Sequence, residues 1–390
     1  MAKASILFSN GREMGRIQEG KPVPLPSQRY ERYCQAEREI ERQHQWKKNS
    51  ESRGTLSFPE GFFTQMGYPQ LENRGPVPRV GGMALLGGTL YYTLLVGGGG
   101  GLYTKDPAAP EKPEGVIVHR QGMLTHGLSW NGASFAVTVE DGPWRHLGFL
   151  TLPRGELTVV TEGETVEEGP SWSRDLQQVW FSSAGCGRDA AGASTGLGPA
   201  AICRLDANTM ELTEVYCSPE HKCLSPKEGA DGSLYFLRRP LREEKESHPI
   251  RDAVLAPGKV MKAVGGWLDL FTQRYAGETL RSGGDAKAKQ KSPEELLIEG
   301  NLINVQRTLE ENQSRGEKFP GLIPRSWELV RLAPGSREPE TVKRGVLTYA
   351  LLPDGGLALS NGRHLFSLAP GGGEELLAEV PMVSMLEAGW

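Results

Sequence analysis

Short apolar segments of strand length recur along the chain, and each of them follows a polar turn. Leu128–Val137 and Pro170–Phe181 each contain a Ser-Trp strand, a polar turn and a second apolar strand. The same unit of a turn and a strand recurs at Leu86–Tyr92, Asp231–Leu237 and Asp354–Leu359. When longer insertions are discounted, the units are spaced by about 40 residues, the length of one four-stranded propeller blade. The pattern therefore predicts an all-β chain.

The repeat divides most of the chain into five blades and leaves a remainder at each end. The remainders are complementary, because Ala4–Pro24 reads as most of a blade and Pro381–Ala388 reads as one inner strand. A blade shared between the termini would remove the open sheet edges of an unclosed ring. We therefore expect residues 1–390 to form a single six-bladed β-propeller closed by strands from both termini, with five or seven blades as alternatives. The five internal blades are placed at 78–118, 119–162, 163–216, 217–342 and 343–380.

One blade carries a motif that resembles a known family. The run Pro170–Asp175 (PSWSRD), followed by the apolar strand Gln178–Ser183, resembles the P-S-W-S-P-D-G signature of TolB-like propeller repeats. Arg174 stands where the family has proline, and Leu176 stands where it has glycine. The resemblance is partial at Ser129–Gly132 and reaches only the turns elsewhere. It implies the fold of TolB-like and WD-repeat-like propellers and no activity, because propellers carry many unrelated functions.

Two segments depart from the strand pattern and predict helical insertions. Residues 27–53 include the charged stretch Gln28–Lys48, which we expect to be a solvated helix on the ring, with a partner-binding helix as the alternative. Residues 241–325 predict a two-helix insertion within one blade, its first helix over Gly258–Leu280. The second helix is expected to begin at Ser292-Pro293-Glu294-Glu295, with Ser as its cap and Pro at its first position. The apolar residues that then recur at helical spacing are Ile298, Leu302, Val305 and Leu309.

Two glycine-rich stretches, Val96–Gly101 and Ala184–Gly198, are expected to be loops between the second and third strands of their blades. The 241–325 insertion occupies the same kind of connection, and the 27–53 helix links one blade to the next. In a propeller these connections emerge together, so we expect all four on one face. Insertions that gather on one face mark the binding side of a repeat protein.

The charge and the cysteines limit the partners and the compartment. The 390 residues carry a formal net charge of -4, so no overall positive field attracts nucleic acid or an anionic membrane. No stretch approaches the roughly 20 apolar residues of a membrane-spanning helix, and the apolar run near the N-terminus is too short for a signal peptide. Five cysteines without framework spacing fit a reducing compartment, so we expect a cytoplasmic protein.

Three motifs that could carry chemistry lack the surroundings that the chemistry needs. Gly192–Gly196 matches G-x-S-x-G and Gly185–Ala190 matches G-x-G-x-x-A, but neither is followed by a helix, so we expect loops. Cys217, His221 and Cys223 offer two thiolates and an imidazole, but a structural zinc site needs a fourth ligand. We therefore predict no catalytic residues, no metal and no cofactor.

His126 and Glu168 occupy equivalent positions, where the innermost strands of two blades begin. Propeller ligands meet such residues, so we name them candidate binding residues together with Arg188 and Asp189 in a neighbouring loop; a structural pair of polar residues is the alternative. The expected function is a non-catalytic binding or scaffold protein that presents its decorated face to a protein or peptide partner. The alternative is an enzyme of hydrolase or lyase type, with its active site at the channel mouth.

Overall fold

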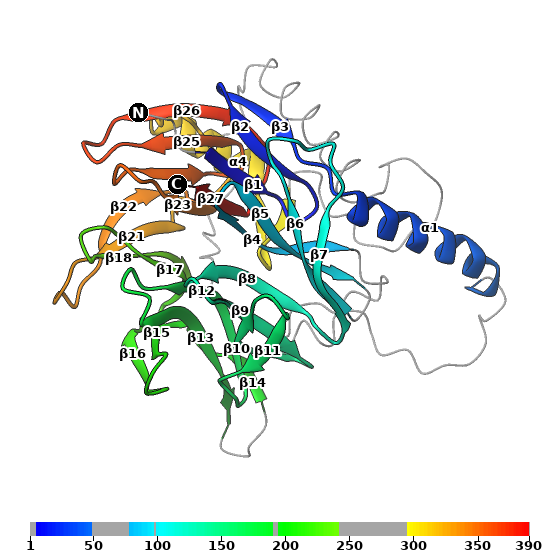
Figure 1. The fold of residues 1–390 in the computed structure, drawn as a ribbon. Coiled ribbons are helices and arrows are strands. Elements are labelled where there is room, and N and C mark those ends of the chain that lie inside the picture. The colour runs from blue at the N-terminus through cyan, green and yellow to red at the C-terminus, as the bar shows by residue number, and fades with distance from the viewer. Residues whose placement is uncertain (1–4, 49–77, 97–98, 190–193, 242–294, 390) are drawn as a thin grey trace. The chain divides into compact units, whose positions relative to one another are not determined.

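A computed structural model, shown in Figure 1, describes residues 5–48, 78–96, 99–189, 194–241 and 295–389. The chain divides into two compact units. The larger unit comprises Met1–Leu241 and Pro324–Trp390, and the smaller unit comprises Arg242–Ile323. Within the described residues, the larger unit is built mainly from strands, and the smaller unit contains a hairpin and a helix.

The strands of the larger unit fall into groups of four, in which neighbouring strands pair antiparallel. The first group comprises β4 (Arg79–Leu86), β5 (Thr89–Val96), β6 (Gly99–Lys105) and β7 (Gly115–Gln121). The second comprises β8 (Thr125–Trp130), β9 (Ser134–Asp141), β10 (Trp144–Thr151) and β11 (Glu156–Val159). The third comprises β12 (Thr165–Trp172), β13 (Gln178–Arg188), β15 (Ala201–Asp206) and β16 (Leu212–Tyr216). Groups two and three merge into one nine-stranded sheet, because Arg145 of β10 pairs in parallel with Val166 of β12.

The remaining strands of the larger unit complete three further groups. The fourth group comprises β17 (His221–Glu228), β18 (Leu234–Pro240), β21 (Glu328–Leu332) and β22 (Glu340–Arg344). The fifth comprises β23 (Thr348–Leu351), β24 (Leu357–Ser360), β25 (His364–Leu368) and β26 (Glu374–Glu379). The sixth comprises β27 (Met385–Gly389), β1 (Ser5–Ser9), β2 (Met14–Gln18) and β3 (Lys21–Pro24). β27 pairs with β1, so this group combines strands from the two ends of the chain.

The first strands of the six groups contact one another in chain order. β4 contacts β8, β8 contacts β12, and β12 contacts β17. β23 contacts β27, and β27 contacts β4. Between β17 and β23 a side chain makes the connection, because the Tyr349 hydroxyl lies 2.7 Å from the carbonyl oxygens of both Ser225 and Tyr235.

Glycines allow the first strands of groups one to four to lie close together. A Cβ on Gly82 would lie 2.6 Å from the carbonyl carbon of Gly127, and a Cβ on Gly127 would lie 2.7 Å from Cδ of Pro170. A Cβ on Gly169 would lie 2.8 Å from Cα of Ser225. Since no side chain fits at these three positions, glycine is what permits the observed approach of one backbone to the next.

Apolar side chains fill the space between neighbouring groups. Trp172 of β12 stacks on Phe149 of β10, with ring centroids 5.4 Å apart, and belongs to a core that groups two and three share. Leu386 of β27 packs in the same way with Ala350 and Leu365 of group five. Burial of such side chains stabilises by about 25 cal/mol for each Å² of apolar surface removed from water, and here it holds the groups together.

The glycine-rich stretches are strands where the sequence predicted loops. Gly99–Gly101 lie inside β6 and are buried, and a Cβ on Gly100 would lie 2.3 Å from the carbonyl oxygen of Met123. These glycines therefore accommodate a neighbouring backbone rather than form an open loop. Similarly, β13 continues to Arg188 and pairs with the short strand β14 (Ser194–Leu197), so most of the predicted loop Ala184–Gly198 is a hairpin.

The structure has a helix after β3, α1 (Gln28–Lys48), within the range 27–53. Ser27 caps it, since its Oγ accepts a hydrogen bond from the backbone N–H of Tyr30 at 3.1 Å. The backbone N–H of Arg29 donates to Glu114 at 3.2 Å, and the Arg29 guanidinium lies 5.1 Å from the centroid of the Tyr103 ring. These contacts attach the first turn of α1 to group one.

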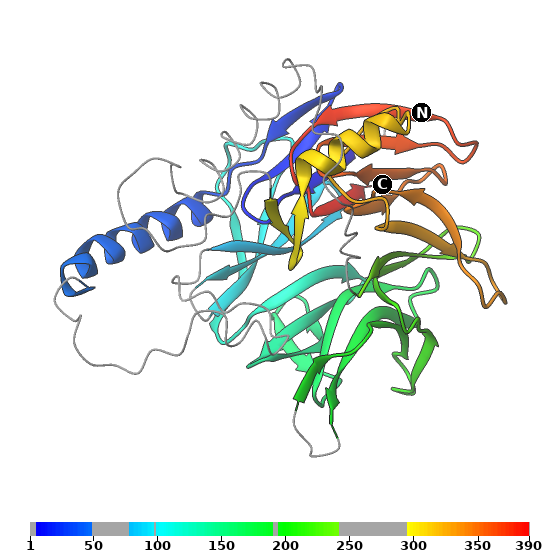
Figure 2. The ribbon, with the colours of Figure 1, turned by 180° about the vertical axis from the view of Figure 1, so that it is seen from behind.

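The prediction of a helix that begins at Ser292 is wrong over its first half. The structure has a hairpin of β19 (Glu295–Ile298) and β20 (Asn301–Asn304), followed by α4 (Val305–Ser314), drawn in yellow in Figure 2. Glu299 and Gly300 both have positive φ, as a two-residue hairpin turn requires, and this turn interrupts the helical spacing. The helix begins after Asn304, whose side chain accepts from the N–H of Arg307. The predicted helix Gly258–Leu280 lies outside the described residues.

Candidate functional site

The register of the strands confirms that His126 and Glu168 are equivalent. Each directly precedes a bulge in the first strand of its group, His126 in β8 and Glu168 in β12. The carbonyl oxygen of each accepts from a hydroxyl on the second strand, Thr138 for His126 at 3.4 Å and Ser182 for Glu168 at 3.0 Å. In β17 the same position is held by Leu224. The bulge therefore sets both polar side chains at the same level of their groups.

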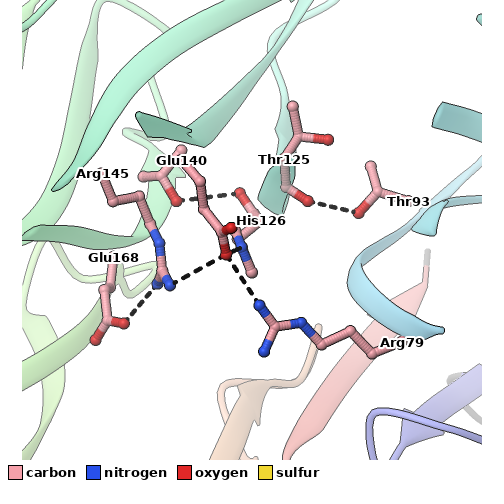
Figure 3. A network of polar contacts seen from close by, with 8 residues as sticks. Arg79, Thr93, Thr125, His126, Glu140, Arg145 and Glu168 are labelled. Carbon is pink, nitrogen blue, oxygen red and sulfur yellow. Dashed lines mark hydrogen bonds and ion pairs between the residues drawn. The ribbon is translucent and has the colours of Figure 1, made fainter. Parts of the chain in front are cut away.

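A chain of ionic contacts links these two positions, and Figure 3 shows it. Nε2 of His126 lies 2.6 Å from Oε1 of Glu140, at the end of β9. Arg79 of β4 donates to the same oxygen at 2.9 Å, and Arg145 of β10 lies 3.8 Å from it. Arg145 also donates to Glu168 at 2.6 Å. We call these five residues the rim network, since they join the beginnings of the first strands of groups one, two and three.

The charges of the rim network set the protonation states of its inner members Glu140 and His126. Burial alone would raise the pKa of Glu140, but the hydrogen bond from His126 and the charges of Arg79 and Arg145 outweigh it and lower that pKa. Burial, with the nearby arginines, lowers the pKa of His126 to about 4 although Glu140 opposes this. His126 is therefore neutral at pH 7, and its Nε2–H donates to the Glu140 carboxylate.

The two ends of the rim network are open to solvent. The Arg79 side chain is 55% exposed and the Glu168 side chain is 44% exposed, whereas Arg145 between them is 19% exposed. The network therefore presents one cation and one anion, from β4 and β12, on either side of β8. Both come from paired strands, so they are held by rigid elements rather than by loops.

Arg188 and Asp189 lie on the β13–β14 hairpin rather than in the rim network. Arg188 pairs with Glu164 through contacts of 3.1 and 2.6 Å, and both side chains are about half exposed. The structure therefore brings together two of the four predicted binding residues, His126 and Glu168, and it places the other two beyond the contacts of the network. That these four residues bind a partner stays a prediction.

The sequence pattern did not identify Arg79, Glu140 or Arg145. Glu140 lies two residues beyond Thr138, the strand partner of His126, so it reaches His126 from the neighbouring strand. A comparison of equivalent repeat positions identifies residues that hold the same place in each group. It misses their partners, because these come from other strands. Polar residues at the ends of otherwise apolar strands were the available signal.

The other candidate motifs form no site among the described residues. His221 Nδ1 lies 3.0 Å from the Ser218 hydroxyl, Cys223 is buried and Cys217 is exposed. No group of three or more His, Cys, Asp or Glu side chains that could hold a metal ion occurs in the described part of the chain. Ser194 of the G-x-S-x-G match lies on β14, and the segment that follows is the strand β15. In the same part of the chain, none of the helices has the length and apolar character needed to cross a membrane.

Comparisons with known proteins find similarity at the level of solved structures. No protein-family model and no curated protein matches the chain. TolB from Acinetobacter baumannii matches over 98% of this chain and 65% of its own length, with a TM-score of 0.48 and 10% identity. A chain of the nidogen/laminin complex matches over 61% of this chain and 71% of its own length, with a TM-score of 0.37 and 10% identity. A puromycin-hydrolyzing peptidase from Mycobacterium tuberculosis matches over 75% of this chain and 45% of its own length, with a TM-score of 0.37 and 14% identity.

The similarities concern the fold alone. The resemblance to TolB predicted from Pro170–Asp175 is confirmed, and this chain spans slightly less than two thirds of the A. baumannii structure. The similar structures include a peptidase beside TolB and the nidogen/laminin complex.

Proposed function

We propose that the chain is a six-bladed β-propeller, closed by the pairing of β27 with β1, that binds a protein or peptide partner through the rim network. Six groups of four antiparallel strands support the blade count, and the succession of contacts between their first strands supports the ring. In our proposal the rim network lies at one mouth of the central channel.

Connections that leave from the same strand ends support a decorated binding face. The first strand of a group begins beside the end of the second, as His221 beside Pro240 shows in group four. The β13–β14 hairpin extends from that end of a second strand, and the chain leaves for the smaller unit after Leu241, just beyond β18. We therefore propose that the β13–β14 hairpin lies on the same face of the larger unit as the rim network.

The observation that carries the binding proposal is the pair of exposed charges, Arg79 and Glu168, at the two ends of the network. Glu140 holds Arg79 at 2.9 Å and Arg145 holds Glu168 at 2.6 Å, so both side chains have fixed positions. A peptide that carries a carboxylate and a cationic side chain can meet both at once, and opposite charges in fixed positions give orientation and specificity.

The test is capture of partners from the native host with the full chain and with the double variant Arg79→Ala/Glu168→Ala. We expect partners captured by the wild type to bind the variant about 10- to 100-fold more weakly, as at binding hot spots. The matched control is Arg331→Ala/Asp231→Ala, which removes another half-exposed ion pair. Undiminished capture by the rim variant, or equal losses in both variants, would refute the rim as the binding site.

Two further variants test the hairpin and the smaller unit separately. Arg188→Ala/Asp189→Ala tests the two predicted residues on the hairpin, and deletion of residues 242–323 tests the smaller unit. If only the hairpin variant loses the partner, the binding residues lie there and the rim proposal is wrong. If only the deletion loses it, the smaller unit carries the binding.

Catalysis at the same rim is the second candidate, because one observation favours it. A neutral imidazole held by a carboxylate at 2.6 Å, with a guanidinium beside them, is an arrangement that general-base catalysis uses. The test is hydrolysis of chromogenic esters and peptides by the wild type and by His126→Gln. Turnover that His126→Gln abolishes, in a protein that remains folded, would establish the enzyme; turnover equal in both proteins would exclude His126 as its base.

A further inference from the structure

A second ionic contact between first strands lies apart from the rim network. Nζ of Lys227, on β17, lies 3.4 Å from Oε1 of Glu387, on β27. β17 and β27 belong to groups four and six, so the contact passes over group five. The two residues are 160 positions apart in the sequence. We call Lys227 and Glu387 the inner pair.

Lys227 stands where two other groups have serine. The bulge register aligns Lys227 of β17 with Ser129 of β8 and Ser171 of β12, since each is the first paired residue after the bulge. The Ser129 hydroxyl is used between groups, where its oxygen accepts from the backbone N–H of Trp172 at 2.9 Å. A lysine at this level therefore replaces a short hydroxyl with a long cation.

The surroundings of the Lys227 ammonium form a small cation site. Besides the Glu387 carboxylate, the ring of Tyr349 lies below Nζ, with its centroid 5.9 Å away. The Tyr349 hydroxyl points elsewhere, toward the carbonyl oxygens of Ser225 and Tyr235. A carboxylate beside an aromatic face is a combination that binds alkylammonium groups.

The two charged side chains of this site are partly exposed, whereas the Tyr349 ring beneath them is buried. The Lys227 side chain is 24% exposed and the Glu387 side chain is 30% exposed. Burial raises the pKa of Glu387, and Lys227 opposes this only in part. The Glu140 carboxylate, by contrast, has two arginines and a histidine around it. Among the described residues, the Lys227 ammonium at 3.4 Å is the cation paired with Glu387.

We propose that Glu387 and the Tyr349 ring form a binding site for a primary ammonium group, and that Lys227 occupies it as an internal stand-in until an external amine displaces it. The ligand class is an alkylamine or the amino group of a peptide. A divalent metal ion fits less well, because a calcium-type site gathers six or more oxygen ligands and the described residues bring no group of three acidic, His or Cys side chains together. The proposal is independent of the rim network, whose residues take no part in it.

The experiment titrates the full chain with n-butylammonium chloride and follows the thermal midpoint, with sodium chloride at equal ionic strength as the reference. We expect n-butylammonium to stabilise the wild type in a saturable manner. Lys227→Met removes the competing ammonium, so we expect it to bind the probe roughly two- to fivefold more tightly. Glu387→Gln removes the carboxylate, so we expect at least about tenfold weaker binding.

The control variant is Glu164→Gln, which removes the carboxylate of an exposed pair with Arg188 and should leave the titration unchanged. The proposal is overturned if the wild type and Lys227→Met both show no effect beyond sodium chloride. It is also overturned if Glu387→Gln binds the probe as well as the wild type does, because the stabilisation then comes from other surfaces. Circular dichroism of each variant before titration establishes that it is folded.

Discussion

The first strands of groups one to three and those of groups four to six are joined by different means. On the side of the rim network, backbones lie so close that Gly82 and Gly127 have no room for a Cβ, and the Glu140 carboxylate is held by three cationic or donor groups. On the side of the inner pair, Tyr349 bridges the strands through its hydroxyl. The Glu387 carboxylate there is paired with one cation among the described residues, Lys227. A carboxylate with many partners stabilises the fold, whereas one with few partners is available to a ligand.

The largest effect is expected from the backbone contact. Gly82→Ala places a Cβ against the main chain of Gly127, which cannot move aside as a flexible side chain could, so we expect a loss of about 3 kcal/mol in the free energy of unfolding. Urea denaturation measures it. The control is Gly373→Ala, since a Cβ on Gly373 meets nothing within 4 Å, and we expect its effect to stay within about 0.5 kcal/mol. Equal effects of the two substitutions would mean that the first strands are not held by close approach.

A smaller loss is expected when the rim network loses its centre. Glu140→Gln leaves Arg79, Arg145 and His126 without the shared anion, so we expect a loss of about 2 kcal/mol at pH 7, less than for a fully buried pair because Glu140 is partly exposed. The matched control is Glu164→Gln, whose exposed partner Arg188 should make the loss at most about 1 kcal/mol. Denaturation of both variants in urea separates the two values, and similar losses would show that the rim network contributes no more than a surface ion pair.

The sequence predicted the elements that local signals determine. The two-residue turn Gly87-Gly88, in which both glycines have positive φ, joins β4 and β5 where the repeat placed a turn and a strand. The complementary ends of the chain also predicted the sheet that β27 and β1 share. At Ser292 the same reasoning went wrong, because Ile298 and Leu302 fit a helical stripe and a hairpin equally well. The turn at Glu299 and Gly300 decides between them, and Gly300 was its only sequence signal.

The site was harder to predict than the fold, for a physical reason. His126 and Glu168 were found because they occupy the same position in two repeats. Glu140 and Arg145 bind them from other strands, so they become visible only when the register of each strand and the contacts between groups are known. Lys227 was missed for the same reason, since its partner Glu387 comes from the opposite end of the chain.

The smallest effect, and the one with the opposite sign, is expected from Glu387→Gln. The folded-state pKa of Glu387 is raised by burial, so the stability that this group contributes is fully present below its unfolded pKa of about 4.3 and is lost as pH rises through the folded value. Gln does not ionise, so the variant has no such loss. Its free energy of unfolding should match that of the wild type near pH 4 and equal or exceed it at pH 7, by less than about 1 kcal/mol.

The contribution of Glu140 to stability has the opposite dependence on pH. Its folded-state pKa is lowered, so its contribution is present above about pH 4.3 and is lost as pH falls through the folded value. The difference between Glu140→Gln and the wild type should therefore be largest at neutral pH and shrink in acid. Urea denaturation from about pH 2 to about pH 8 measures both profiles. If Glu387→Gln instead destabilises the protein at pH 7 as Glu140→Gln does, Lys227 fully satisfies its carboxylate, and the contrast between the two sides disappears.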